Sequence, residues 1–245
     1  MIVDATVPKS AGQLFDRRLF TVAAIGFTVL VLVGFAPTYY LRGLFDLPPL
    51  SSLAHLHGLL MTAWVVLFLF QIAFISDRRV RLHRRVGYGG IALAALIAAT
   101  GALATLRAGK YGSAAFPPDI PSLAFMIVPV FDLPIFVVLF GAAIYYRRQT
   151  AVHKRLMLLT ALNFLSAAVA RIPVAALQAL GPLWFFGLPG GLALLCLGLD
   201  ARAHGRVNHA FLAGSILLIA SYPARLALMN TTGWMNAARW MTDFV

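Results

Sequence analysis

The sequence contains no glutamate, and all eight of its acidic side chains are aspartates. This absence excludes glutamate as a catalytic base, and it excludes the glutamate-bridged di-iron sites of four-helix bundles. Cysteine is almost as rare, since Cys196 is the only one. An intrachain disulfide and a metal site built from several thiolates are therefore excluded as well.

Charged residues are also scarce. They make up 11% of the 245 residues, and 61% of the residues are apolar, whereas roughly a quarter of a soluble domain is charged. The apolar residues form seven uninterrupted runs, and a bilayer core needs about 20 apolar residues per helix. The runs cover 20–40, 52–75, 86–106, 122–146, 156–178, 182–199 and 209–229. They do not alternate in polarity as barrel strands do, so they predict a single all-α domain, a seven-transmembrane helix bundle.

The order of the runs predicts one helix followed by three helical hairpins. Residues 231–245 then have apolar side chains at helical spacing, which predicts a short interfacial helix. No lysine lies deep in any run. A retinal Schiff base is therefore excluded.

The net charge of +12 is distributed in a way that argues against nucleic-acid binding. Basic residues crowd four segments on one side of the predicted bundle: Lys9, Arg17 and Arg18; Arg78, Arg79, Arg81, Arg84 and Arg85; Arg147, Arg148, Lys154 and Arg155; and Arg202 and Arg206. The loops and tail on the other side carry only Arg42, Arg107, Lys110 and Arg239. Because positively charged loops stay in the cytoplasm, we expect a multi-pass protein of the inner (plasma) membrane, with the N-terminus inside and the C-terminus outside. The expected partner is the lipid bilayer with its anionic head groups.

Two opposite charges lie inside the outer half of the predicted bundle. Asp132 stands about ten residues into the fourth run and Arg171 about seven residues before the end of the fifth, so antiparallel helices rising about 1.5 Å per residue place them at similar depth. A charge in the bilayer core costs on the order of 3 kcal/mol by insertion scales. We therefore predict an Asp132–Arg171 ion pair, either structural or part of a site.

Prolines surround these charges, at positions 129, 134, 173 and 223. Each proline frees a carbonyl and bends its helix, and bent helices that carry charges often line cavities. Arg225 follows the last of them and has no predicted acidic partner. With His57, which shares an inward face with Met61 and Trp64, it would complete a site for a small anionic or proton-coupled ligand. The alternative is that Arg225 reaches lipid phosphates.

Three histidines, His83, His153 and His209, stand at the inner starts of three predicted helices. Three converging imidazoles could hold a transition metal, and two could ligate a haem, which would be haem b. One alternative is that they contact lipid phosphates and loop carbonyls. Another is that they relay protons.

A longer pattern links several of these residues: His55, His57, Gly58, Trp64 and Gln71; Leu82-His83-Arg84-Arg85 and Gly87; and His153-Lys154-Arg155 with Arg171. Over residues 50–175 the chain resembles a family of bacterial polytopic membrane proteins to which no chemistry is assigned. Its arrangement of histidines on helices is loosely similar to that of b-type cytochrome membrane proteins, which implies a bound haem by analogy.

Three functions remain open at this stage. The first is a haem- or metal-binding redox membrane protein, and the second is a transporter or ligand-binding protein. The third is a structural or assembly subunit of a membrane complex, since no catalytic constellation is recognisable. A membrane-embedded zinc hydrolase is disfavoured, because such seven-helix families place paired histidines in the last helix and only His209 lies there.

Overall fold

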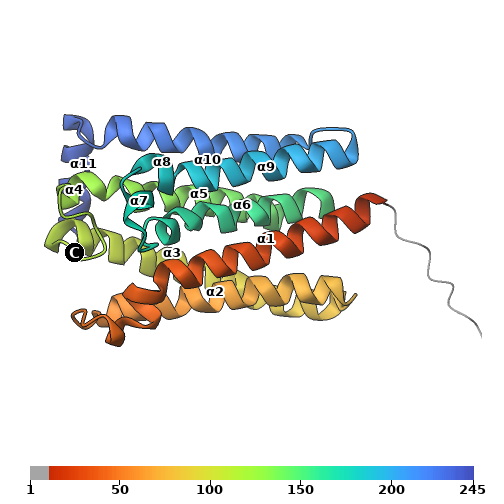
Figure 1. Ribbon diagram of the computed structural model, residues 1–245, viewed down its shortest axis with the longest axis horizontal. Coiled ribbons are helices and arrows are strands. Elements are labelled where there is room, and N and C mark those ends of the chain that lie inside the picture. The colour runs from red at the N-terminus through yellow and green to blue at the C-terminus, as the bar shows by residue number, and fades with distance from the viewer. Residues whose placement is uncertain (1–10) are drawn as a thin grey trace, which may run out of the picture.

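The computed structural model describes residues 11–245, and Lys9 lies outside the described residues. The described residues contain helices and no strand, and the long helices run side by side along one axis (Figure 1). The elements are α1 (Ala11–Phe35), the π-helix η1 (Ala36–Tyr40), the 3-10 helix η2 (Arg42–Leu44), α2 (Ser52–Ser76), α3 (Val80–Tyr111), α4 (Ser122–Phe125), α5 (Ile127–Tyr145), α6 (Thr150–Val169), α7 (Ala175–Gln178), α8 (Pro182–Phe185), α9 (Gly187–His204), α10 (His209–Leu228) and α11 (Thr232–Thr242).

Six helical stretches are long and apolar enough to cross a membrane: Leu14–Tyr40, Ser52–Ser76, Val80–Tyr111, Ser122–Tyr145, Pro182–His204 and His209–Leu228. They confirm the prediction of an all-helical, multi-pass membrane protein. The remaining predicted span, 156–178, corresponds to α6, which is not among the six. It carries Lys154 and Arg155 near its start and Asn163 near its middle, so it is less apolar than its neighbours.

The α6 helix forms the centre of the bundle. Twelve of its residues are buried, and it packs against α1, α5, α8, α9 and α10. The approach to α1 is close, because a Cβ added at Gly34 would overlap the backbone carbonyl of Ala168. A helix surrounded by other helices can carry polar side chains that a lipid-facing helix cannot, since its partners can satisfy them.

Several helices begin at side-chain caps that the sequence provides. Ser51 Oγ accepts a hydrogen bond from the Ala54 N–H at 3.2 Å, Asn208 Oδ1 accepts one from Phe211 at 3.0 Å, and Thr231 Oγ1 accepts one from Trp234 at 3.2 Å. Each cap satisfies an N–H group that has no partner within its helix. The last cap starts α11, which confirms a short helix in the tail.

Breaks near prolines divide three of the predicted runs. The α6 helix ends at Val169, four residues before Pro173, and the chain resumes a helix only at α7. A proline has no N–H to donate and keeps the preceding residue out of helical conformation. The prediction of one continuous helix over 156–178 is therefore wrong in its last third. Similar interruptions separate α4 from α5 and α8 from α9.

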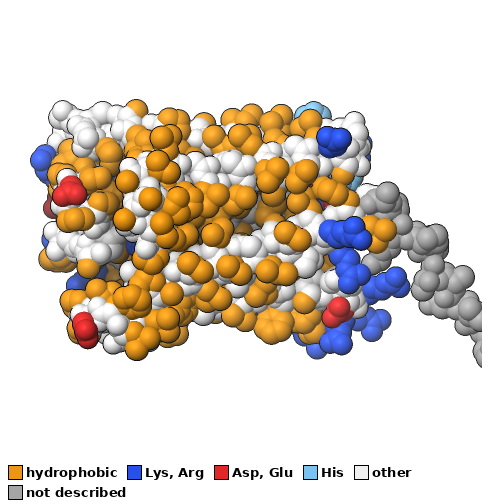
Figure 2. Space-filling model, viewed as in Figure 1, with side chains coloured by type: hydrophobic (Ala, Val, Ile, Leu, Met, Phe, Trp, Pro, Cys, Tyr) orange, Lys and Arg blue, Asp and Glu red, His pale blue; other side chains and the backbone are white. Residues whose placement is uncertain are grey.

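The surface of the bundle is apolar between its two ends. Large apolar side chains such as Val22 (68% exposed) and Ile216 (58% exposed) point outward from the spans. Figure 2 shows lysine and arginine side chains gathered mainly at the end where α1 begins, with apolar side chains covering the middle. Such a broad apolar surface is typical of a protein surrounded by lipid.

Candidate ligand site around Asp132 and Arg225

A buried ion pair joins α5 and α10. Arg225 is fully buried, and its Nη1 donates to Asp132 Oδ1 at 2.6 Å and to the Val128 carbonyl at 3.2 Å. Its Nη2 donates to Ser221 Oγ at 3.1 Å. Asp132 is 9% exposed. A buried charge is tolerated when it is paired and hydrogen-bonded, and Arg225 meets both conditions.

Three aromatic rings complete the surroundings of Arg225. The guanidinium carbon lies 5.9 Å from the ring centre of Phe131 and 5.5 Å from those of Phe186 and Tyr222. The rings of Phe186 and Tyr222 stack on each other, 4.5 Å apart. These distances favour cation–π attraction, which helps to hold the guanidinium away from water.

The predicted Asp132–Arg171 pair is wrong. Arg171 instead lies just beyond the end of α6, where its Nη1 donates to the Ala167 carbonyl at 2.6 Å and its Nη2 to the Ala115 carbonyl at 3.4 Å. Its guanidinium carbon is 5.0 Å from the ring centre of Phe35. Because α6 ends early, Arg171 bonds to the Ala167 carbonyl at the negative end of the helix dipole, and to the Ala115 carbonyl in the loop between α3 and α4.

Arg225 has an acidic partner, Asp132, although the sequence analysis predicted none. The argument for an anionic ligand depended on an unpaired arginine, and that premise is wrong. The predicted position of Asp132 and Arg225 in one site is correct, since the packing of α10 on α5 brings them together.

Buried polar atoms around this pair lack hydrogen-bond partners. Among the described residues, Arg225 Nε, Tyr222 Oη and Asn163 Oδ1 have no such partner. Asn163 belongs to the same network, because its Nδ2 donates to the backbone carbonyl of Asp132 at 3.0 Å. Buried polar groups in native proteins nearly always have a partner, which can be water or a ligand.

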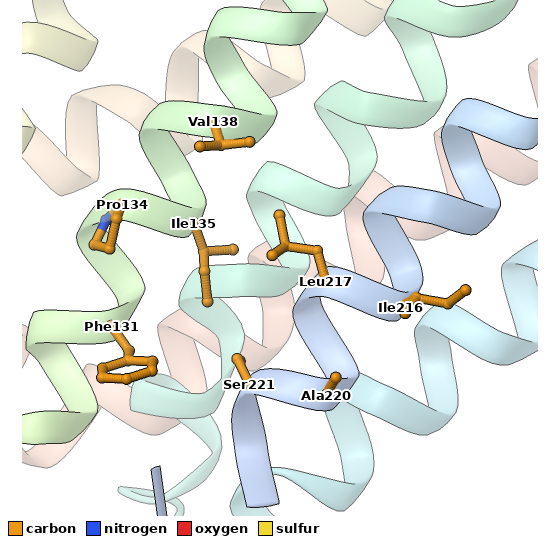
Figure 3. A pocket seen from close by; sticks show the side chains of 8 residues that line it. All are labelled: Phe131, Pro134, Ile135, Val138, Ile216, Leu217, Ala220 and Ser221. Carbon is orange, nitrogen blue, oxygen red and sulfur yellow. The ribbon is translucent and has the colours of Figure 1, made fainter. Parts of the chain in front are cut away.

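An apolar groove lies beside the pair, between α5 and α10 (Figure 3). Its volume is about 430 Å³, and its walls are Phe131, Pro134, Ile135 and Val138 on one side and Ile216, Leu217, Ala220 and Ser221 on the other. Phe131 and Ser221 line the groove and also contact Arg225. The groove therefore ends against the polar network.

His57 lies in a different layer of the bundle. Its Nδ1 is 3.0 Å from Thr100 Oγ1, so it joins α2 to α3. The inward orientation predicted for His57 is correct. Among the described residues, however, no hydrogen bond or ion pair connects it with Asp132, Arg171 or Arg225.

The three histidines that were predicted to converge, His83, His153 and His209, do not form one group. The rings of His83 and His153 are neighbours, with centres 6.3 Å apart, and His153 Nδ1 lies 2.8 Å from the Ala143 carbonyl. His209 stands at the start of α10. Within the described part of the chain, one group of three potential metal ligands is present, and it contains none of these residues.

That group belongs to a second polar cluster, at the basic end of the bundle. Arg155 donates two hydrogen bonds to the Asp200 carboxylate, from Nε to Oδ2 at 2.8 Å and from Nη2 to Oδ1 at 2.6 Å. Lys154 pairs with Asp16, and His204 Nε2 lies 3.6 Å from Asp16 Oδ1. The ligand atoms of Asp16, Asp200 and His204 lie within 4.8 Å of one another.

The second cluster fastens α1, α6 and α9 together. Both carboxylates already have a cationic partner, so a metal ion would have to displace Lys154 and Arg155. Sequence analysis missed this cluster. One signal was present: Asp200 and His204 directly follow the sixth apolar run, and they are four residues apart and so share a helical face.

Comparison of the chain with protein-family models, characterised proteins and solved structures gives no match. The resemblance to a family of bacterial polytopic membrane proteins therefore stays a prediction.

Proposed function

We propose that the chain is a seven-pass protein of the inner (plasma) membrane, with its N-terminus inside. The α6 helix supplies the seventh pass, since it has 20 residues and lies parallel to the other long helices (Figure 1). The basic side chains at the end where α1 begins support a cytoplasmic position for that end. An odd number of passes then puts α11 on the outer side.

Within this frame the protein acts as a transporter or ligand-binding protein whose site surrounds Asp132 and Arg225. One observation carries this proposal: a fully buried guanidinium with an unpartnered Nε stands among further buried polar atoms that have no partner. A small polar group bound there would satisfy these atoms. Ligand sites are typically apolar pockets with a few converging polar groups, and this site has that composition.

The Tyr222 hydroxyl offers a sharp test. Within the described residues it has no hydrogen-bond partner, so Tyr222→Phe removes no internal bond. If the hydroxyl bonds a ligand, the change costs about 1 kcal/mol of binding, which is roughly a fivefold weaker Kd. The matched control is Tyr88→Phe, because Tyr88 is 68% exposed and lies on α3.

The measurement is thermal unfolding of the protein in phosphatidylcholine nanodiscs, with and without monooctanoylglycerol or octanoate. We expect at least one probe to raise Tm in the wild type and in Tyr88→Phe, and to raise it less in Tyr222→Phe. An equal Tm increase in both variants, or no increase with either probe, would contradict the proposed site.

A second candidate function is the binding of haem or a metal by His83 and His153. It is favoured by their adjacent rings and by the buried His83 Nδ1, which has no partner. Two imidazoles could serve as axial ligands of a haem or as half of a zinc site. Metal analysis and a visible spectrum of the purified protein test it, and a colourless, metal-free preparation would reject it.

A further inference from the structure

The groove between α5 and α10 has one polar end and one apolar end. At the polar end, Phe131 and Ser221 line the groove (Figure 3), and both also contact the Arg225 guanidinium. From Phe131 to Val138 the α5 wall covers eight residues, or about 10 Å of helix. All groove-lining residues beyond the polar end are apolar.

The direction of the groove matches the outer leaflet. In the topology proposed above, α5 begins at the outer surface, so Phe131 lies nearer that surface and Val138 nearer the bilayer centre. An amphiphile of the outer leaflet has its polar head outward and its chain toward the centre. It could therefore enter the groove sideways, without turning over.

The charges at the polar end indicate which head group fits. Asp132 and Arg225 neutralise each other, so an added anionic head would bring an uncompensated charge into a buried site. The unpartnered atoms comprise a donor at Arg225 Nε, an acceptor at Asn163 Oδ1 and a hydroxyl at Tyr222. A head with both a hydroxyl and a carbonyl group could satisfy a donor and an acceptor together.

Building on the proposed function, we propose that the ligand is a single-chain amphiphile with an uncharged, hydrogen-bonding head, such as a monoacylglycerol. Its chain occupies the groove between α5 and α10, and its head bonds the atoms around Arg225. The bilayer supplies it from the outer leaflet.

A photoactivatable monoacylglycerol with a mid-chain diazirine tests this proposal, in the full-length protein in phosphatidylcholine nanodiscs. We expect labelling to concentrate on α5 and α10 residues of the groove, and to fall when excess monooleoylglycerol competes. Ala220→Phe fills the groove and should lower labelling about fivefold or more. Ala213→Phe is the matched control, since Ala213 is exposed two turns earlier on the same face and does not line the groove. A lysophosphatidate probe with the same chain should label the groove less.

The outcomes separate this proposal from the proposed function. If Tyr222→Phe reduces the Tm increase but Ala220→Phe leaves labelling unchanged, the polar site stands and the groove proposal is overturned. Labelling spread evenly over the lipid-facing sides of α1 and α2, or equal labelling by the two head groups, also overturns it. Loss of labelling only in Ala220→Phe and Tyr222→Phe supports it.

Discussion

The bundle contains two buried aspartate–arginine pairs, and their surroundings differ. At the basic end, Arg155 holds Asp200 with two hydrogen bonds, and the two side chains are 4% and 0% exposed. In the other half, Arg225 holds Asp132 through one nitrogen, and the aspartate side chain is 12% exposed. All three guanidinium nitrogens of Arg155 donate hydrogen bonds, whereas Arg225 Nε has no partner among the described residues. This difference distinguishes an ion pair that stabilises the fold from an ion pair that can also bind a ligand.

The largest effect on stability is expected at the Arg155–Asp200 pair. Asp200→Asn leaves Arg155 buried without a counter-charge, and removal of one partner from such a pair costs about 3–5 kcal/mol. We expect a large loss of thermal stability in detergent, measured by differential scanning fluorimetry. The control is Asp119→Asn in an exposed loop. The double change Arg155→Met with Asp200→Leu should recover most of the loss, and a failure to recover would show that the charges do more than fasten helices.

A smaller loss of stability is expected at the Asp132–Arg225 pair. Asp132→Asn should cost about 2–3 kcal/mol, because Arg225 keeps its bonds to Val128 and Ser221. A double-mutant cycle with Arg225→Gln should show a coupling of about 1–3 kcal/mol, since the two residues are in contact. A coupling near zero would contradict the pairing seen in the structure.

Arg171 should have a smaller effect again. Arg171→Ala removes one bond to the Ala167 carbonyl at the end of α6 and one to the Ala115 carbonyl of a loop. A cation at the end of a helix is typically worth about 0.3–1 kcal/mol. A double-mutant cycle between Arg171 and Asp132, measured in the same unfolding assay, should give no coupling. Significant coupling would restore the pair that the sequence predicted.

The smallest effect on stability is expected for Tyr222→Phe in the protein freed of ligand. Because the hydroxyl has no partner, unfolding in detergent should shift by less than about 0.5 kcal/mol. Tyr40→Phe provides a contrast, since the Tyr40 hydroxyl is 3.1 Å from Thr62 Oγ1. A larger loss in Tyr222→Phe than in Tyr40→Phe would mean that the hydroxyl serves the fold.

Much of the architecture could be predicted from the sequence, because hydrophobicity and length determine where a chain can cross a bilayer. The predicted runs match the long helices, but their ends differ: the run 86–106, for example, corresponds to the longer helix α3, Val80–Tyr111. The break after Val169 was missed because the apolar composition continues past it, although Pro173 indicated a stop.

The partner of Asp132 could not be predicted in the same way. Depth estimates place several residues at one level of the membrane, but they do not say which helix faces which. Arg171 and Arg225 both fitted the depth of Asp132, and the choice depended on the packing of α10 against α5. The second polar cluster was missed for the same reason, because Asp16, Arg155 and Asp200 come from three different helices.

The most direct test of a ligand bound at Arg225 is a high-resolution cryo-electron microscopy map of the protein in nanodiscs containing monooleoylglycerol. We predict density that contacts Arg225 Nε and the Tyr222 hydroxyl and continues into the groove between α5 and α10. Direct bonds between these protein groups, or a single water-sized peak with an empty groove, would contradict the account.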